Sequence, residues 1–424
     1  MRVLHTADWH FGRVLEGRSR LPEHEAFVEE LVAIVREEQI DLVLVAGDVY
    51  DGVNPAAQSE ELFYDALVRL SQGGRVPIVV IAGNHDHPDR LHASSPLAAK
   101  QGIHLFGLPI EQTITLPLSR AQQTAVIYPL AYPSEARLNE LLSIEADEAM
   151  LREAYSDRIA AMIQQQASAF RRDTVNIVMS HLFASGGVNS ESERPIEVGG
   201  AYTVDATSLC GIRRQSADSS MSVEISSIPP EMPPMMPTTP PLLPQYVALG
   251  HLHRAQQLTA PGDTIVRYSG SPLAFSFAEH GQAKSVTIID LSPGELPTVK
   301  EVPLSSGRPL IRWRPAGGLE EVYRWIDEGR DSRAWIELEL RLTEALTTNH
   351  IQQLRKLREG LVIIRPVYVT DQDQADAPFQ REDVPMDEIF RRFHRKQTGG
   401  AEATPELVRL FLELLNQNTE EVAP

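Results

Sequence analysis

The chain has 424 residues, 42% of them hydrophobic and 23% charged, which is ordinary for a soluble globular protein and favours two or three domains. Its formal net charge is −19, from 58 acidic and 39 basic residues. This charge excludes nucleic-acid binding through a general positive field, so any contact with DNA or RNA must come from local basic patches or bound cations.

The compartment is constrained by the cysteine content and by the N-terminus. Cys210 is the single cysteine, which excludes an internal disulfide and a multi-cysteine zinc site and fits a reducing compartment. No apolar segment is long enough to span a bilayer, and the N-terminus lacks the pattern of a signal peptide. Cleavage there would also remove Asp8 and His10, which are proposed below as metal ligands. We therefore expect a cytoplasmic protein without a membrane anchor.

Residues 1–110 alternate between apolar runs and amphipathic stretches. The runs are rich in β-branched residues and predict buried strands at 3–7, 42–46 and 78–81. Between them, apolar residues recur at i, i+4, i+7 and i+8 from Phe27, which predicts a helix that begins near Glu23. A second apolar stripe, from Leu62 to Leu70, predicts another helix. Such alternation is typical of parallel strands joined by helical crossovers.

The middle of the chain continues this pattern with one interruption. Two strands are predicted within 113–130, a largely helical region from Glu135 to about Arg172, and further strands at 175–179, 246–249, 263–268, 284–290 and 297–302. Together they predict a first domain over residues 1–305. Residues 214–244 interrupt it with a Ser-, Met- and Pro-rich stretch without periodicity, which predicts an extended or disordered surface insertion. A tolerated loop extension is the favoured interpretation, and a binding segment is the alternative.

The C-terminal part predicts a small module and a helical tail. A β-α-β-α-β pattern lies within residues 306–375, at 310–314, 319–327, 335–342, 350–358 and 362–369. Residues 380–420 contain two amphipathic helix candidates, 385–397 and 405–415, separated by Thr398-Gly399-Gly400. The apolar stripes of these helices either pack on their own domain or dock on a partner.

Side chains that bind metals follow five of the predicted strands. They are Asp8, His10, Asp48, Asn84, His181, His251 and His253. Each short motif alone has another explanation, such as a turn-forming aspartate or a hydrogen-bonded core histidine. Because the carboxyl ends of parallel strands meet at one edge of a sheet, the five motifs in this order predict one metal site.

The chemistry of this ligand set favours two transition-metal ions. Mixed oxygen and imidazole donors suit Mn²⁺, Fe²⁺ or Zn²⁺ better than Mg²⁺, which prefers oxygen. Seven donors are too many for one tetrahedral ion and suit two ions that share a carboxylate, for which Asp48 is the natural candidate. Two ions about 3.5–4 Å apart can stabilise both sides of an in-line phosphoryl displacement and lower the pKa of a bound water. The predicted reaction is phosphoester hydrolysis.

These motifs resemble those of the calcineurin-like metallophosphoesterases. The matching residues are Asp8-x-His10, Gly47-Asp48-x-x-Asp51, Gly83-Asn84-His85-Asp86, His181 and Gly250-His251-x-His253. Three further segments are similar to the SbcD family, the nuclease subunits of SbcCD complexes: residues 5–10, Glu193-Arg194-Pro195 and Tyr268-Ser269-Gly270-Ser271-Pro272. The resemblance covers most of residues 1–290 and, more loosely, the module and tail, whereas the Pro-rich insertion departs from it. It implies an α/β fold: a metallophosphoesterase β-sandwich flanked by helices, a small α+β capping domain and C-terminal helices.

The resemblance also implies a role for each site residue. One metal would be held by Asp8, His10, Asp48 and His253, and the second by Asp48, Asn84, His181 and His251. His85 would be a catalytic residue that is not a ligand. Beside the scissile phosphate it can stabilise phosphoryl charge or protonate the leaving oxygen. Asp51 and Asp86 either orient these imidazoles from behind or serve only as turn-forming acids.

Arginines near the motifs are candidates for DNA binding, because guanidinium groups grip phosphates bidentately. They are Arg13, Arg18, Arg90 and Arg254, with Arg20 and Arg194 as further candidates. A scatter of exposed arginines without such a role is the alternative.

The function implied by the resemblance is a Mn²⁺-favouring, two-metal DNA nuclease subunit. It would act as a double-strand exonuclease and as a single-strand and hairpin endonuclease in DNA repair, recombination and replication. Its partners would be an SbcC-type ATPase, whose coiled coil receives the tail helices, and a second copy of itself within a heterotetramer. The alternatives are a small-substrate phosphodiesterase or protein phosphatase, which needs neither module nor tail, and a non-catalytic scaffold. A scaffold is expected to lose a ligand, and none of the seven is missing.

Overall fold

The computed structural model describes residues 1–138, 148–190, 192–193, 202–213, 242–342, 346–368, 386–397 and 403–411. Internal contacts divide the chain into two compact units, residues 1–341 with 346–367, and residues 342–345 with 368–424. Most of the predicted Pro-rich insertion, residues 214–241, lies outside the described residues.

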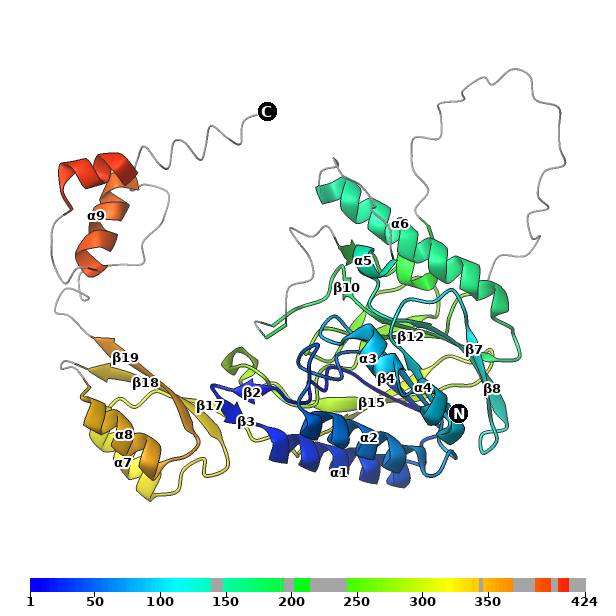
Figure 1. Cartoon of the computed structure of the whole chain (residues 1–424), viewed down its shortest axis with the longest axis horizontal. Helices are drawn as coiled ribbons and strands as arrows, with labels where there is room; N and C mark the ends of the chain where they lie inside the picture. Colours follow the sequence, from blue (N-terminus) through cyan, green and yellow to red (C-terminus); the bar gives the residue numbers. More distant parts are fainter. Residues whose placement is uncertain are drawn as a thin grey trace, which may run out of the picture. The chain divides into compact units, whose positions relative to one another are not determined.

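The first unit contains two six-stranded sheets (Figure 1). The order of the first sheet is β16-β15-β1-β4-β5-β6. Its strands are β1 (Arg2–Thr6), β4 (Leu42–Ala46), β5 (Ile78–Ile81), β6 (Ile103–Phe106), β15 (Ser285–Asp290) and β16 (Thr298–Pro303). The strands from β1 to β6 are parallel, and α1 (Leu21–Glu37) and α2 (Ala57–Ser71) connect the first three. Strands β1, β4 and β5 therefore end at the same edge of the sheet.

The second sheet has the order β13-β14-β12-β9-β8-β7. Its strands are β7 (Ile114–Leu118), β8 (Gln123–Leu130), β9 (Val175–His181), β12 (Tyr246–Gly250), β13 (Gln256–Leu258) and β14 (Ile265–Tyr268). The four strands from β8 to β14 are parallel, and the outer two are antiparallel. Strand β13 escaped prediction because its three residues include two glutamines and show no apolar run.

Helices cover both outer faces of the two sheets. The inner core joins the first sheet, α1 and α2 to Ile177 and Met179 of β9, whereas Val178 faces the other way, into a cluster with α6 (Glu148–Gln166). This alternation follows from the two-residue period of a strand. The predicted β-sandwich flanked by helices is therefore confirmed.

Short elements complete this sandwich. They are β2 (Val14–Leu15), β3 (Arg18–Ser19), α3 (Pro88–His92), α4 (Ser95–Ala98), η1 (Ala99–Gln101), α5 (Glu135–Leu138), η2 (Ala167–Ala169), β10 (Phe183–Ala184), β11 (Thr203–Val204), η3 (Ser208–Cys210) and η4 (Phe277–Glu279). The helix predicted from Glu135 to Arg172 is thus present as α5 and α6, and residues 139–147 between them lie outside the described residues.

The small module follows the sandwich within the same compact unit. Its elements are β17 (Leu310–Trp313), α7 (Gly318–Asp327), β18 (Trp335–Leu342), α8 (Thr348–Leu357) and β19 (Leu361–Tyr368), in the predicted order. The strands form a three-stranded sheet in the order β17-β18-β19. Leu310, Trp335 and Val362 of the module pack with Leu15 and Phe277 of the sandwich, so an apolar contact joins the two.

The second unit contains the tail. Helix α9 spans Met386–Gln397, and a further helical segment covers residues 405–411, the described part of the predicted 405–415 helix. The rings of Phe390 and Phe411 stack with their centroids 4.2 Å apart. Among the described residues, no helix has the length and apolar character that a membrane crossing requires.

Candidate metal centre

The seven predicted ligands lie just beyond β1, β4 and β5 of the first sheet and at the ends of β9 and β12 of the second. Four of them adopt left-handed backbone conformations, with φ of 55° at Asp8, 46° at His10, 48° at Asp48 and 106° at His251. Such conformations cost on the order of 1–3 kcal/mol each, and they cluster at functional sites. The strain therefore marks these strand ends as the site of function.

Two glycines let the strand ends approach one another. Gly47 has a φ of +93°, and a Cβ added there would lie 2.3 Å from Nδ1 of His181. A Cβ on Gly250 would lie 1.9 Å from the carbonyl oxygen of Ala46. At Gly250, where φ is not positive, the requirement is space between the two sheets rather than turn geometry.

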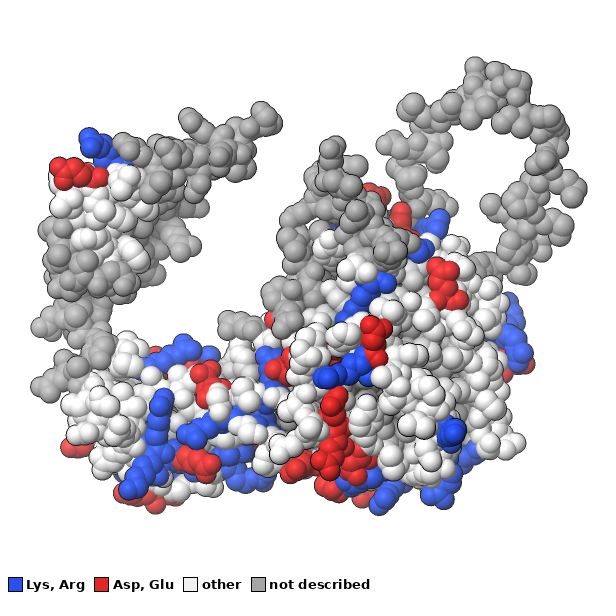
Figure 2. All heavy atoms as spheres, in the orientation of Figure 1, with Lys and Arg blue, Asp and Glu red and all other residues white. Residues whose placement is uncertain are grey.

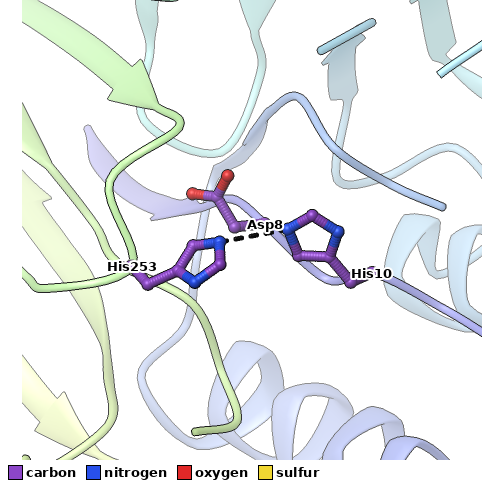
Figure 3. A group of neighbouring side chains, drawn as sticks. All are labelled: Asp8, His10 and His253. Carbon is purple, nitrogen blue, oxygen red and sulfur yellow. Dashed lines mark hydrogen bonds between the residues drawn. The ribbon is translucent and has the colours of Figure 1, made fainter. Parts of the chain in front are cut away.

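The first ligand group consists of Asp8, His10 and His253 (Figure 3). All three are buried, and the Nε2 atoms of His10 and His253 are 3.1 Å apart. The hydroxyl of Ser192 lies 2.6 Å from Nδ1 of His253. If Nδ1 donates its hydrogen there, the lone pair of Nε2 faces His10 and the Asp8 carboxylate.

The second group consists of Asp8, Asp48 and His181. Nδ1 of His181 lies 2.9 Å from the Ala46 carbonyl oxygen, an acceptor to which it donates. Nε2 lies 2.9 Å from Oδ1 of Asn84 and 3.5 Å from Oδ2 of Asp48. When His181 is neutral, with its hydrogen on Nδ1, these three atoms are electron-pair donors that converge on one point, which fits a bound cation.

His251 stands beside this group. Its backbone N–H donates to both carboxylate oxygens of Asp8, at 3.0 and 3.2 Å, and its ring centroid is 5.5 Å from that of His181. The structure thus brings ligand candidates from both sheets to one place. Asp8 belongs to both groups, and each group draws on the two sheets.

The electrostatics of the cluster also favour a cation. Burial raises the pKa of Asp8 well above its usual range and lowers the pKa values of His10 and His251 well below theirs. Burial alone would lower the pKa of His181, but the Asp48 carboxylate outweighs it and raises the value to about 9. Neutral His10 and His251 are competent ligands, and a divalent cation would displace the proton of His181 and favour the ionised form of Asp8. The donor set therefore fits divalent metal ions.

His85 lies at the edge of the cluster. Its backbone N–H donates to Oδ1 of Asp48 at 2.9 Å, and its Nδ1 lies 2.8 Å from the carbonyl oxygen of Asp51. Its Nε2 is 3.9 Å from Oδ2 of Asp48, and its ring centroid is 4.7 Å from that of His10. The bond to Asp51 fixes the ring so that Nε2 faces the site.

The two aspartates predicted to orient imidazoles do different things. Oδ1 of Asp51 lies 3.5 Å from Nδ1 of His10, which fits an orienting contact. Asp86 instead accepts hydrogen bonds from the backbone N–H groups of Gly83, Val49 and Tyr50. These bonds fit the second alternative for Asp86, a turn-forming acid, because its carboxylate braces the loops that carry Asp48 and Asn84.

Sequence reasoning missed several residues around His253. Oε1 of Glu193 accepts the His253 backbone N–H at 2.9 Å, and Nζ of Lys284 donates to the His253 carbonyl oxygen at 3.0 Å. The buried carboxylate of Glu279 pairs with Lys284. Ser192 and Lys284 carry no spacing signal, and only the Glu193-Arg194-Pro195 similarity pointed to this loop. Their role is visible only once the fold brings them together.

The candidate arginines differ in their availability. Arg13 pairs with Asp51 at 3.2 Å, and Arg90 lies 3.7 Å from Glu60. Arg18 and Arg254 are exposed. Arg20 is only 1% exposed and bonds within the protein, so the expectation that it grips DNA is wrong. Arg194 lies outside the described residues.

On the face shown in Figure 2, Lys and Arg are interspersed with Asp and Glu over the described residues and form no single basic area. Binding of a polyanion on this side would therefore depend on particular side chains rather than on a general field.

The sandwich and its strand-end cluster define a calcineurin-like phosphoesterase. A family model described as calcineurin-like phosphoesterase matches residues 1–198, and one described as type 5 capsule protein repressor C-terminal domain matches residues 306–398. The chain is 49% identical to the SbcD subunit of the nuclease SbcCD from Bacillus subtilis, over 100% of both chains.

Two further relatives carry the same name. The Rhodobacter capsulatus protein is 34% identical over 77% of this chain and 75% of its own, and the Escherichia coli K12 protein is 28% identical over 92% of each. The chain belongs to the SbcD family of SbcCD nuclease subunits.

Proposed function

We propose that the protein is the nuclease subunit of an SbcCD-type complex and hydrolyses phosphodiester bonds at DNA ends and hairpins during repair, recombination and replication. The observation that carries this proposal is the cluster of buried candidate ligands, in which two groups share Asp8 at the junction of two sheets. The names of its full-length relatives supply the class of substrate and the complex.

The proposed centre holds two divalent ions. Asp8, His10, Asp48 and His253 would hold one, and Asp48, Asn84, His181 and His251 the other, with Asp48 shared. Mn²⁺ is the proposed metal, because imidazole and carboxylate donors together suit it. When bound, such a pair supplies an activated water and neutralises charge on the phosphate.

The chain's own residues position the substrate and move the proton. The carbonyl of Asp51 holds Nδ1 of His85, so Nε2 faces the place where a phosphate would sit above Asp48. A protonated His85 would donate at Nε2 to a phosphoryl oxygen or to the leaving oxygen. Exposed Arg18 and Arg254 would contact the DNA backbone, whereas Arg13 and Arg90 would first have to leave their acidic partners.

The remaining parts of the chain would serve DNA access and assembly. The proposed domains are the nuclease domain over 1–305, a capping domain over 306–375 and tail helices over 380–420 that dock on the coiled coil of an SbcC-type ATPase. Chromosomal DNA as the substrate would place the protein in the cytoplasm. The stack of Phe390 on Phe411 supports a tail that presents its two helices together.

A homodimer within a heterotetramer is the proposed assembly. Three apolar side chains of α2 and α4 are unusually exposed, Tyr64 at 38%, Val68 at 59% and Leu97 at 72%. They line a hollow of about 450 Å³. An exposed apolar patch of this kind supports a contact between two copies of the chain.

The test compares wild type, Asp48→Asn and His85→Ala, with Mn²⁺, on a hairpin-ended duplex and on a chromogenic phosphodiester. We expect wild type to cut both substrates and both variants to lose at least about a hundredfold in DNA cutting, because each removes a group that acts on the reacting phosphate. Only Asp48→Asn should also weaken Mn²⁺ binding in calorimetry. A second arm adds an SbcC-type ATPase and ATP.

The results on the two substrates test the metal centre and the nuclease proposal separately. If the wild type hydrolyses the small ester but leaves DNA intact even with the ATPase, the metal centre stands and the nuclease proposal is wrong. If His85→Ala loses metal binding as Asp48→Asn does, His85 is a ligand rather than the proton donor.

A further inference from the structure

A buried carboxylate connects the sandwich to the small module. Glu23, in the first turn of α1, is 5% exposed. Its Oε1 accepts the indole N–H of Trp335 at 2.8 Å, and its Oε2 accepts the backbone N–H of Arg308 at 2.7 Å. Both donors lie in or just before the module, so one side chain of the sandwich fixes two points of the module.

The same carboxylate is held rigidly from the sandwich side. Nε and Nη2 of Arg20 donate to its two oxygens, each at 2.6 Å. Arg20 also donates from Nη1 to the carbonyl oxygen of Ala274 at 2.7 Å. A bidentate pair of this kind fixes the plane of the guanidinium relative to the plane of the carboxylate. With the bonds from Trp335 and Arg308, each carboxylate oxygen of Glu23 accepts two hydrogen bonds.

This network ends one residue from the metal centre. Phe275 follows Ala274, and its ring centroid lies 5.1 Å from that of His10 and 5.4 Å from that of His253. The guanidinium of Arg13 lies 5.0 Å from the same ring. The Glu23–Arg20 pair that holds the module is therefore connected, through Ala274, to a residue that contacts His10 and His253.

The contact between sandwich and module is otherwise partly open. A hollow of about 420 Å³ lies between them, lined by Leu273, Ala274 and Lys284 on one side and by Arg308 and Leu310 on the other. The guanidinium of Arg308 covers the ring of Trp335 at 3.8 Å. Because the interface is not filled, the orientation of the module depends strongly on the bonds to Glu23.

We infer that Glu23 is a positioning residue for DNA cleavage: through Trp335 and Arg308 it fixes the module beside the metal centre and so sets the path of the DNA. The inference rests on the proposed nuclease function. A small phosphodiester reaches the metals without touching the module, so its hydrolysis does not depend on this connection, whereas a duplex or hairpin end must fit between module and metals.

The test uses the full-length protein with Mn²⁺ and the two substrates used above. Trp335→Phe removes one N–H donor and leaves the Glu23–Arg20 pair intact. We expect kcat/KM for hairpin DNA to fall about tenfold, mainly through KM, because one hydrogen bond to a buried charged acceptor is lost. Hydrolysis of the chromogenic ester should stay within about twofold of wild type.

Two matched variants separate positioning from general damage. Trp325→Phe changes a tryptophan of the same module that contacts Trp313 and Arg330, and it should leave both substrates unaffected. Glu29→Gln removes an exposed carboxylate of α1 that pairs with Arg69, and it should behave likewise. Glu23→Gln should reproduce the loss of Trp335→Phe, and the double variant should lose less than the product of the two, since both act on one bond.

A second readout does not depend on cutting. Hydrogen exchange at the Arg308 amide should accelerate in Glu23→Gln and Trp335→Phe and not in the controls. Equal loss on both substrates, or DNA cutting and exchange at wild-type levels in both variants, would overturn the inference. If wild type itself fails on DNA but hydrolyses the ester, the nuclease proposal fails first, and unchanged Arg308 exchange would then also reject Glu23 as the residue that fixes the module.

Discussion

Single side chains behind the ligands decide how the metal centre is presented. The Ser192 hydroxyl lies 2.6 Å from Nδ1 of His253, and Glu193 and Lys284 hold the backbone of His253 in place. None of the three points into the cluster itself. Their contribution is orientation, and the loss of a partner of this kind typically lowers metal affinity or activity about 10- to 100-fold.

The hydroxyl of Ser192 provides a prediction at this scale. Ser192→Ala removes the hydroxyl that bonds to Nδ1 of His253, so the ring is no longer held in one tautomer and orientation. We expect Mn²⁺ affinity to fall roughly tenfold, in line with the loss of such partners elsewhere. Isothermal calorimetry on the metal-stripped protein measures it.

Ser168→Ala is the control, because Ser168 is exposed and bonds only to the carbonyl of Gln165. An unchanged affinity in Ser192→Ala would show that Glu193 and Lys284 suffice to orient His253.

Strands from two sheets converge at the site, and glycine allows them to lie this close together. Gly250 ends β12 opposite the carbonyl of Ala46, the same carbonyl that receives the His181 hydrogen bond. A larger residue must push β4 and β12 apart. The fold and the site therefore depend on the same backbone contact.

Gly250→Ala is accordingly expected to destabilise the protein by about 3 kcal/mol or more, because the added methyl overlaps with backbone rather than with a flexible side chain. Thermal or urea unfolding of the purified variant measures the loss, and failure to express in folded form agrees with it.

The comparison is Gly52→Ala, at a position where an added Cβ meets nothing within 4 Å. It should change stability by no more than about 0.5 kcal/mol. Equal stability of the two variants would mean that β4 and β12 can separate without cost.

Element by element, prediction from the sequence succeeded where local signals were strong. Apolar runs followed by metal-binding side chains predicted the strand ends at Asp8, Asp48 and Asn84, and helical periodicity predicted α1 and α2. The three-residue strand β13 carried no such signal. The burial of Arg20 and the bracing role of Asp86 were not predictable either, because Ala274, which accepts from Arg20, and Tyr50, which donates to Asp86, lie far away in the chain and only the tertiary fold brings them near.

The whole molecule contains buried neutral histidines away from the metal centre. Burial lowers the pKa of His5 to about 3 and that of His24 to about 3. His5 bonds to the hydroxyl of Tyr246 in the core between the sheets, and the ring of His24 packs on Phe11. Both must stay neutral in the folded protein, so acid acts on the fold as well as on catalysis.

The sign of the resulting pH dependence follows from proton binding. Between about pH 6.5 and 3 the unfolded chain binds protons at these histidines that the folded protein does not. The contribution of these two histidines to stability is therefore complete above pH 6.5 and falls as the pH drops, by about 1.4 kcal/mol per pH unit for each histidine. Urea unfolding at pH 7 and pH 5.5 measures it.

His24→Gln should reduce the change of the unfolding free energy with pH by about 1.4 kcal/mol per pH unit, the contribution of one histidine. His87→Gln, a change at an exposed position, serves as the matched control. The same slope in His24→Gln as in wild type would mean that His24 is protonated in the folded protein.

The separation of the ligands along the chain has a consequence for biosynthesis. The first group needs Asp8 and His253 together, and the proposed second ion needs His251. A ribosome that has not yet passed these histidines therefore carries a nascent chain in which neither metal site can be completed. The protein can therefore complete its candidate metal sites only after most of its sandwich has been synthesised.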